Sequence, residues 1–190
     1  MTLQRVLSGE LVQLRPLEPR DADRLCEVVQ DPETRRLTGE TQTFTKNDIN
    51  EWISRVSGAK DRFNFAMSSL MTDADGVVDD SLIGEVVLSE YSQVLGSATV
   101  DLQSLATFRG RGYGREAMSL VMKFAFTPAP QGLGLHRLEL NVLSINPRAK
   151  MLYESLGFIQ EGVLRDAALD GDDYCDVIVM SILKDEYQEQ

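Results

Sequence analysis

The chain of 190 residues has few of the residues that cross-link small proteins or bind metal ions. It contains 2 cysteines, Cys26 and Cys175, and 1 histidine, His136. The cysteines do not form a Cys-x-x-Cys pair, and one histidine cannot supply a zinc-type cluster of ligands. A disulfide-stabilised mini-protein is therefore excluded, and we predict that the chain uses no metal.

Positive charge and long apolar runs are also scarce. The 19 Lys and Arg residues stand against 30 Asp and Glu residues, a net charge of −11 that disfavours binding to the phosphate backbone of nucleic acids. The N-terminal region carries Glu10, Glu18, Asp21 and Asp23, and the apolar runs fall far short of the roughly 20 residues that span a bilayer. We expect a reduced, cytoplasmic protein with no nucleic-acid or membrane partner.

The residues that are present indicate one globular domain. Hydrophobic residues make up 43% and charged residues 26% of the chain, close to the averages for soluble proteins. No internal repeat, low-complexity tract or linker rich in Pro, Gly and Ser divides the sequence. Residues 1–190 are therefore expected to fold as a single domain.

Hydrophobic patterns place strands and helices along this domain. Strands are predicted over residues 11–17, 63–71, 82–91, 97–105, 137–142, 158–169 and 174–183. Helices are predicted over about 21–29, 45–56, 117–124 and 146–157, with Asp21, Thr45 and Asn146 as caps. Asp170-Gly171 favours a tight turn between the last two strands. The sum is an α/β (α+β) domain built on a mixed sheet.

A glycine-rich, basic loop lies between the fourth predicted strand and the third predicted helix. It reads Phe108-Arg109-Gly110-Arg111-Gly112-Tyr113-Gly114-Arg115. Amides at a helix N-terminus favour an anion, and glycine lets the main chain approach a phosphate closely. Arg115 stands where a dinucleotide fingerprint needs glycine, and no Walker-type phosphate loop is present. A polyanionic cofactor is favoured over the alternative of a plain turn with solvated arginines.

Two blocks of this sequence resemble signatures of the GNAT N-acetyltransferase superfamily. Arg109, Gly112 and Gly114 match the Arg-x-x-Gly-x-Gly pattern of its acyl-coenzyme A pyrophosphate loop. Residues 146–158, from Asn146 through Tyr153 to Phe158, resemble its later Asn-x-x-Ala-x-x-Leu-Tyr-Glu-x-x-Gly-Phe signature. The opening 14–17 and the ending 176–183 resemble the RimJ/RimL-like branch of ribosomal-protein-alanine and spermidine acetyltransferases. The likeness covers about residues 10–185.

The resemblance implies a fold and an activity. The expected GNAT fold is a mixed, mostly antiparallel central sheet of about seven strands flanked by about four helices. The implied reaction moves an acetyl group from acetyl-CoA, without a metal, by direct attack of a primary amine. The acceptor is a protein N-terminus or a small amine such as a polyamine. Homodimers are common in this branch.

The resemblance also implies roles for particular residues. Amides of Leu102, Gln103, Ser104 and Leu105, at the end of a splayed and bulged strand, are expected to bind the thioester carbonyl. Tyr153 is the expected general acid and Glu85 the expected general base, with a water relay as the alternative base. The remaining expected contacts to the cofactor or substrate are Arg109, Gly110, Arg111, Gly112, Tyr113, Gly114, Arg115, Asn141 and Asn146.

Several alternatives stay open from the sequence. Tyr153 also fits a helical stripe of core residues, and Asn146 also fits a helix cap. Acidic segments at 73–80 and 170–173 either attract a cationic acceptor or are only solvated. The competing functions are a non-catalytic acyl-CoA-binding regulatory module and a nucleotide-binding interaction domain.

Overall fold

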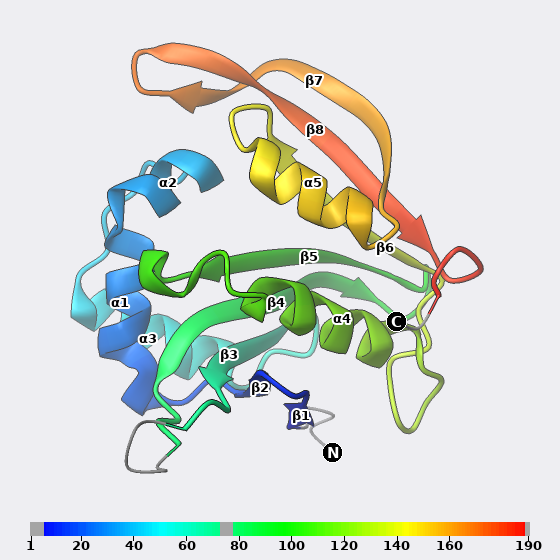
Figure 1. The fold of residues 1–190 in the computed structure, drawn as a ribbon, viewed down its shortest axis with the longest axis horizontal. Coiled ribbons are helices and arrows are strands. Elements are labelled where there is room, and N and C mark those ends of the chain that lie inside the picture. Colours follow the sequence, from blue (N-terminus) through cyan, green and yellow to red (C-terminus); the bar gives the residue numbers. More distant parts are fainter. Residues whose placement is uncertain (1–5, 73–77, 189–190) are drawn as a thin grey trace.

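One twisted sheet organises the molecule (Figure 1). The computed structural model describes residues 6–72 and 78–188, and in these residues eight strands follow the order β1-β2-β3-β4-β5-β6-β8-β7. The strands are β1 (Leu7–Ser8), β2 (Val12–Pro16), β3 (Phe63–Ser69), β4 (Leu82–Ser92), β5 (Ser97–Ser104), β6 (Arg137–Leu143), β7 (Ile159–Asp170) and β8 (Asp173–Leu183). The α-helices are α1 (Ala22–Gln30), α2 (Pro32–Thr38), α3 (Lys46–Val56), α4 (Tyr113–Phe126) and α5 (Pro147–Ser155). The predicted mixed α/β class is confirmed, with β1 and α2 added.

The local signals of the sequence act largely as predicted. Thr45 and Asp48 form a capping box at the start of α3, and the Asn146 side chain accepts a hydrogen bond from the amide of Ala149 at 3.1 Å. The expectation for Asp21 is wrong, because its carboxylate does not cap α1. It pairs instead with the guanidinium of Arg15 at 2.7 and 2.8 Å, and this ion pair is buried.

Helices cover both faces of the sheet. The larger core cluster packs α4, through side chains such as Met118 and Val121, against one face of the central strands. A smaller cluster packs α1 and α3, through Leu25 and Ile53, against the other face. Each buried aliphatic side chain contributes about 1.5–3 kcal/mol. Within the described residues, no helix is both long enough and apolar enough to cross a membrane.

The sheet opens where its one described parallel pair occurs. All other described neighbours are antiparallel, whereas β5 and β6 run parallel and pair only over Ser97–Thr99 and Arg137–Glu139. Beyond these residues the two strands diverge. The splay matches the expectation, but the bulge expected near Leu102 does not, since β5 keeps continuous register with β4 from Thr99 to Ser104. The register shifts lie instead at Met67/Ser68 between β3 and β4 and at Ser89/Ser92, near the other end of the β4–β5 pairing.

Candidate active site

The divergence of β5 from β6 leaves one edge of β5 open. The amide of Leu105 donates to the carbonyl of Ile83 at 2.9 Å, which fixes the hydrogen-bond alternation along the β4–β5 ladder. By this alternation the amide of Gln103 also turns toward β4. The amides of Leu102 and Ser104 turn toward the gap. Two of the four expected backbone donors therefore face the opening.

A cavity of about 570 Å³ lies along this open edge. It is bounded by the end of β5, the glycine loop, the start of α5 and one face of α2. Most of the residues predicted to contact the cofactor line this cavity: Leu102, Gln103, Ser104, Arg109, Gly110, Gly112, Gly114, Arg115 and Asn146. Three others lie elsewhere. Arg111 is exposed, the ring of Tyr113 is buried against Phe108, and Asn141 lines a neighbouring cavity.

The glycine loop presents backbone donors to this cavity. Gly110 and Gly112 have φ values of 78° and 89°, which glycine adopts without strain. Gly112 is the N-cap of α4 and offers no side-chain cap. Among the described residues, the amides of Gly110 through Gly114 donate no hydrogen bond. These donors and the helix dipole make an anion site at the start of a 14-residue helix.

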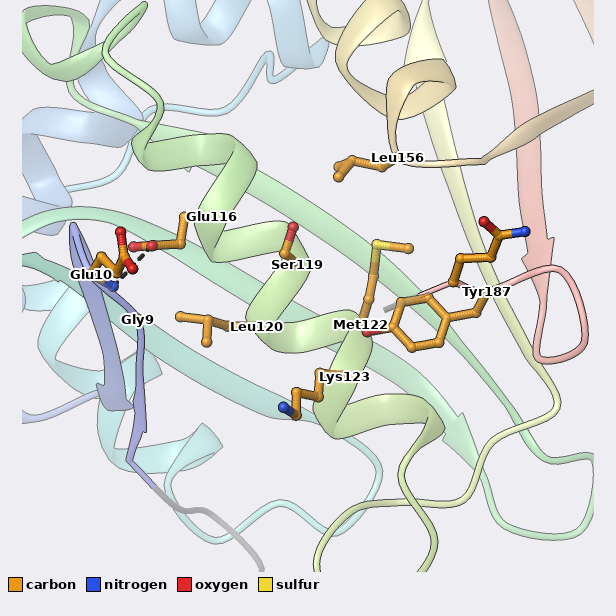
Figure 2. Close-up of a pocket in the computed structure, with 10 residues that line it drawn as sticks. Gly9, Glu10, Glu116, Ser119, Leu120, Met122, Lys123, Leu156 and Tyr187 are labelled. Carbon is orange, nitrogen blue, oxygen red and sulfur yellow. Dashed lines mark hydrogen bonds between the residues drawn. The ribbon is translucent and has the colours of Figure 1, made fainter. Parts of the chain in front are cut away.

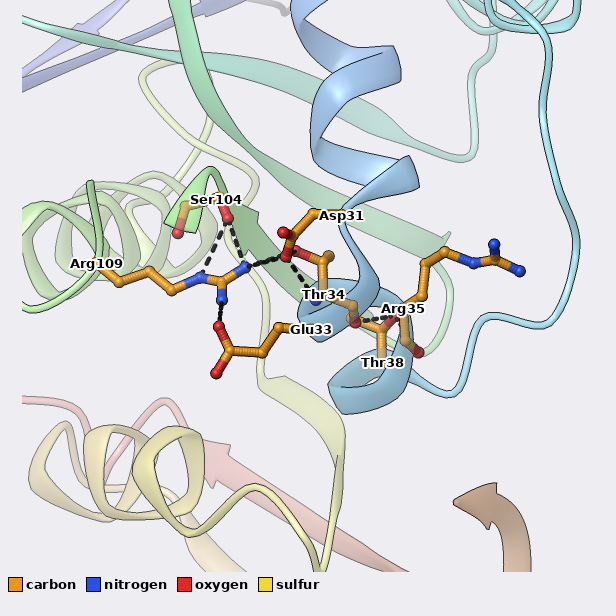
Figure 3. A network of polar contacts seen from close by, with 7 residues as sticks. All are labelled: Asp31, Glu33, Thr34, Arg35, Thr38, Ser104 and Arg109. Carbon is orange, nitrogen blue, oxygen red and sulfur yellow. Dashed lines mark hydrogen bonds and ion pairs between the residues drawn. The ribbon is translucent and has the colours of Figure 1, made fainter. Parts of the chain in front are cut away.

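Arg109 does not offer a free charge to this anion site, contrary to the sequence-based expectation (Figure 3). Its guanidinium contacts Asp31 at 3.1 Å, the carbonyl of Ser104 at 3.0 Å, and also Glu33 and Thr34. Although partial burial opposes it, hydrogen bonds from Thr34 and Arg109 lower the pKa of Asp31 below its ordinary value. Arg109 therefore fastens α2 to the end of β5.

Two other arginines border the loop. Arg115 donates to the hydroxyl of Ser155 at 2.6 Å, which links α4 to α5. Arg148 was not predicted as a site residue, yet its Nη2 lies 3.3 Å from where a Cβ on Gly110 would stand. Its signal in the sequence was its place beside the N-cap of the helix over 147–155. Because α5 starts next to the glycine loop, this position brings a cation to the anion site.

Tyr153 lies where the first cavity meets a second one. It is 7% exposed, packs against Phe158 with ring centroids 5.9 Å apart, and lines both cavities. Tyr153 is therefore both a core residue and a residue that borders the two cavities. Burial, reinforced by the negative charge of Asp101, raises the pKa of Tyr153 well above its ordinary value. The phenol is protonated throughout the physiological pH range.

The second cavity, of about 670 Å³, lies on the far side of Tyr153 and has a different character. It shares Leu102, Gln103, Asn146 and Tyr153 with the first cavity. The rest of its wall is largely aliphatic, but it also carries three carboxylates, two aromatic rings and an amide, which are Glu40, Glu85, Asp101, Phe44, Trp52 and Asn141. Arg62 also lines it, and the Cζ of its guanidinium lies 5.6 Å from the centroid of the Trp52 ring. One cavity therefore offers anion donors and the other offers carboxylates.

Glu85 is held tightly in the wall of this second cavity. It is 2% exposed, its Oε1 accepts from Asn64 at 2.8 Å, and its Oε2 accepts from Gln103 at 3.1 Å. Burial raises the pKa of Glu85, while these two hydrogen bonds oppose the shift. Both carboxylate oxygens thus already have partners within the protein.

Other features named from the sequence lie apart from the two cavities. His136 is exposed, and Asp170 is bound by Arg36 through two contacts of 2.6 and 2.9 Å. Residues 73–77 of the first acidic segment fall outside the described residues. Within the part of the chain that is described, no group of three or more His, Cys, Asp or Glu side chains is placed to hold a metal ion.

A further hollow of about 330 Å³ lies beside α4, away from Tyr153 (Figure 2). Its wall includes Glu116, whose carboxylate accepts hydrogen bonds from the amides of Glu10, Leu11 and Val12 at 2.7–2.9 Å. Glu116 therefore ties the first strands to α4. None of the predicted site residues lines this hollow.

A mixed sheet that splays beside a glycine loop, with a tyrosine at the junction of two cavities, fits an acyltransferase. The family description "Acetyltransferase (GNAT) domain" matches residues 12–159. The chain belongs to the GNAT acetyltransferase family, and it is an enzyme.

Relatives and solved structures agree with this assignment. An uncharacterised N-acetyltransferase, p20 of Bacillus licheniformis, is 30% identical over 186 residues, covering 95% of this chain and 97% of that protein. A spermidine N(1)-acetyltransferase of Vibrio cholerae is 34% identical over 114 residues, covering 58% of this chain and 64% of that protein. A crystal structure of Vibrio cholerae spermidine N-acetyltransferase with CoA and spermine has a TM-score of 0.82 and 26% identity. That match covers 94% of this chain and 99% of that one.

Proposed function

We propose that this enzyme transfers the acetyl group of acetyl-CoA to a primary amine by direct attack across the gap between β5 and β6. The observation that carries the proposal is the meeting of two unlike cavities at Tyr153. The cavity with open amides suits a polyanionic cofactor, and the cavity with carboxylates suits a cationic acceptor. Both reach the open edge of β5, so the two substrates would meet there.

The residues of the first cavity fit acetyl-CoA. Its pyrophosphate would be held by the amides of Gly110 through Gly114, with Arg115 and Arg148 nearby. The amides of Leu102 and Ser104 would bind the thioester carbonyl. Such oxyanion donors contribute about 2.7–4 kcal/mol each where one has been removed from an enzyme. Bound acetyl-CoA supplies the activated acetyl group.

The reaction needs two proton transfers, one from the acceptor amine and one to the leaving sulfur. The acceptor nitrogen must lose a proton before attack, which costs about 1.4 kcal/mol at pH 7 for an amine of pKa near 8 and roughly 4.6 kcal/mol for one near 10.4. When the carbon–sulfur bond breaks, its electron pair leaves on sulfur, and the phenol of Tyr153 donates a proton there. The phenolate then regains a proton from the new amide nitrogen. Tyr153 thus acts as general acid.

Relatives and charge support a small amine or polyamine as acceptor. The similar proteins include spermidine acetyltransferases, which also supports the RimJ/RimL-like branch. In this chain the second cavity is walled by Glu40, Glu85 and Asp101, and α2 lines one side of it through Thr34 and Leu37. A carboxylate-rich cavity of this size suits a compact cationic amine.

Thiol release tests the proposal. Purified protein is mixed with acetyl-CoA and a panel of polyamines, alkylamines, amino acids and N-terminal peptides, and free coenzyme A is measured together with the acetylated product. We expect amine-dependent release that is fastest with polycationic small amines. Binding of coenzyme A without turnover for any amine would instead identify a regulatory module, and binding of ATP or NAD in place of coenzyme A would identify a nucleotide-binding domain.

A further inference from the structure

We propose that Asp101 is the residue that binds the ammonium group of the acceptor and removes its proton. This inference rests on the proposed acetyl transfer and adds to it the group that recognises the amine. Asp101 lies outside both sequence motifs and was not among the residues predicted for the site.

The place of Asp101 on β5 puts it at the reaction gap. It lies two residues beyond Thr99, the last residue of β5 that pairs with β6, and opposite Val87 of β4. Side chains alternate along a strand, so Asp101 shares a face with Gln103 and, across the ladder, with Glu85. It lines the second cavity together with Tyr153 and is exposed to it.

Asp101 is a carboxylate without a partner among the described residues. It accepts no hydrogen bond and forms no ion pair there, and the one opposing charge acting on it is that of Arg62, at longer range. The other carboxylates that line the two cavities have partners: Glu85 accepts from two side-chain amides, Glu33 pairs with Arg109, and Glu40 accepts from the backbone amide of Gln42. The oxygens of Asp101 are thus available to a cation that enters the cavity.

The groups around Asp101 make its carboxylate a better proton acceptor. Arg62 faces it from the segment before β3, Glu85 and Glu90 from β4, Tyr153 from α5, and Glu40 from the connection after α2. Loss of surrounding water raises the pKa of Asp101, with the charge of Arg62 opposing the shift and that of Glu90 adding to it. A carboxylate with a raised pKa is a stronger base than a solvated one. The charge of Asp101 acts on Tyr153. Both residues line the second cavity, so the proposed base and acid face the same space.

The proton then follows a balanced course. The ammonium binds to the Asp101 carboxylate and transfers one proton to it, leaving a neutral amine and a carboxylic acid. The amine nitrogen attacks the thioester carbon, and the carbon–sulfur bond breaks as described for Tyr153. Asp101 later releases its proton to solvent. Glu85 serves as a positioning residue in this scheme, because its oxygens hold the side chains of Asn64 and Gln103.

The test compares Asp101→Asn with Glu85→Gln and with a control, Asp185→Asn, which changes an exposed carboxylate in the turn after β8. Each variant is assayed with a strongly basic alkylamine and with trifluoroethylamine, which is largely neutral at pH 7. We expect Asp101→Asn to lower kcat/KM for the alkylamine about 100-fold and for trifluoroethylamine far less. Calorimetric affinity for coenzyme A should stay unchanged, and Asp185→Asn should match the wild type.

The outcomes separate the two proposals. If the wild type acetylates amines and Asp101→Asn keeps its kcat/KM for the alkylamine, the role of Asp101 is refuted while the acetyl transfer stands. Equal losses with both amines would also refute it, since they would indicate a structural effect. A large selective loss in Glu85→Gln alone would make Glu85 the base. If the wild type acetylates no amine, the proposed function fails first.

Discussion

A single residue, Tyr153, shows how core packing and chemistry coincide in this molecule. Its ring lies among buried residues beside Phe158, yet it borders both cavities. Tyr153→Phe keeps the ring and removes the hydroxyl. We expect kcat to fall at least about 100-fold, because no group would protonate the leaving sulfur, while affinity for coenzyme A stays within about 2-fold. Steady-state kinetics and calorimetry measure the two quantities, and wild-type turnover would remove Tyr153 from the mechanism.

At the scale of elements, α2 is the part of the site that sequence patterns did not reveal. Its signals were present: Asp31 caps it through the amide of Thr34 at 2.8 Å, Pro32 opens it, and Gly39 ends it with φ of 73°. The helix is 7 residues long and carries one large apolar side chain, Leu37, so no periodicity marks it. By contrast, α3, α4 and α5 carry apolar stripes or caps and were predicted.

Sequence patterns could not supply the contacts between distant elements either. The loop glycines and Tyr153 were found because their motifs are local. Glu33, one partner of Arg109, lies 76 positions away in the sequence, and the neighbours of Asp101 come from several elements. Such pairings depend on how the sheet is assembled. Local sequence therefore could not show that the guanidinium of Arg109 is already paired with carboxylates.

The contacts of Arg109 with α2 and its N-cap, Asp31, lead to a prediction. Arg109→Ala removes an ion pair and hydrogen bonds that are partly shielded from solvent, and we expect a loss of about 1–3 kcal/mol in the free energy of unfolding. Hydrogen exchange in α2 should accelerate, and KM should rise for both substrates because α2 lines both cavities. Arg111→Ala, at an exposed arginine of the same loop, is the control and should leave α2 unchanged. Weaker coenzyme A binding with normal exchange in α2 would mean that Arg109 contacts phosphate instead.

At the scale of the whole molecule, the site is a consequence of sheet topology. Antiparallel pairing continues from β1 to β5, and the single described parallel pair with β6 opens after three residue pairs. The opening exposes backbone donors between the α4 and α5 helices, and Figure 1 shows α4 and α5 on either side of the gap. In a chain with a net charge of −11, the first cavity is lined by Arg109, Arg115 and Arg148, whereas three carboxylates, Glu40, Glu85 and Asp101, line the second. Under the proposed function, this arrangement would give each substrate its own cavity.

In the proposed complex, the main-chain amides of residues 110–114 hold the coenzyme A pyrophosphate. Titration of ¹⁵N-labelled protein with coenzyme A, followed through the backbone amide resonances, tests this contact. We predict the largest shifts at Gly110 through Gly114, with further shifts at Leu102 and Ser104. Saturable binding that leaves these amide resonances unchanged and shifts others would show that coenzyme A binds elsewhere.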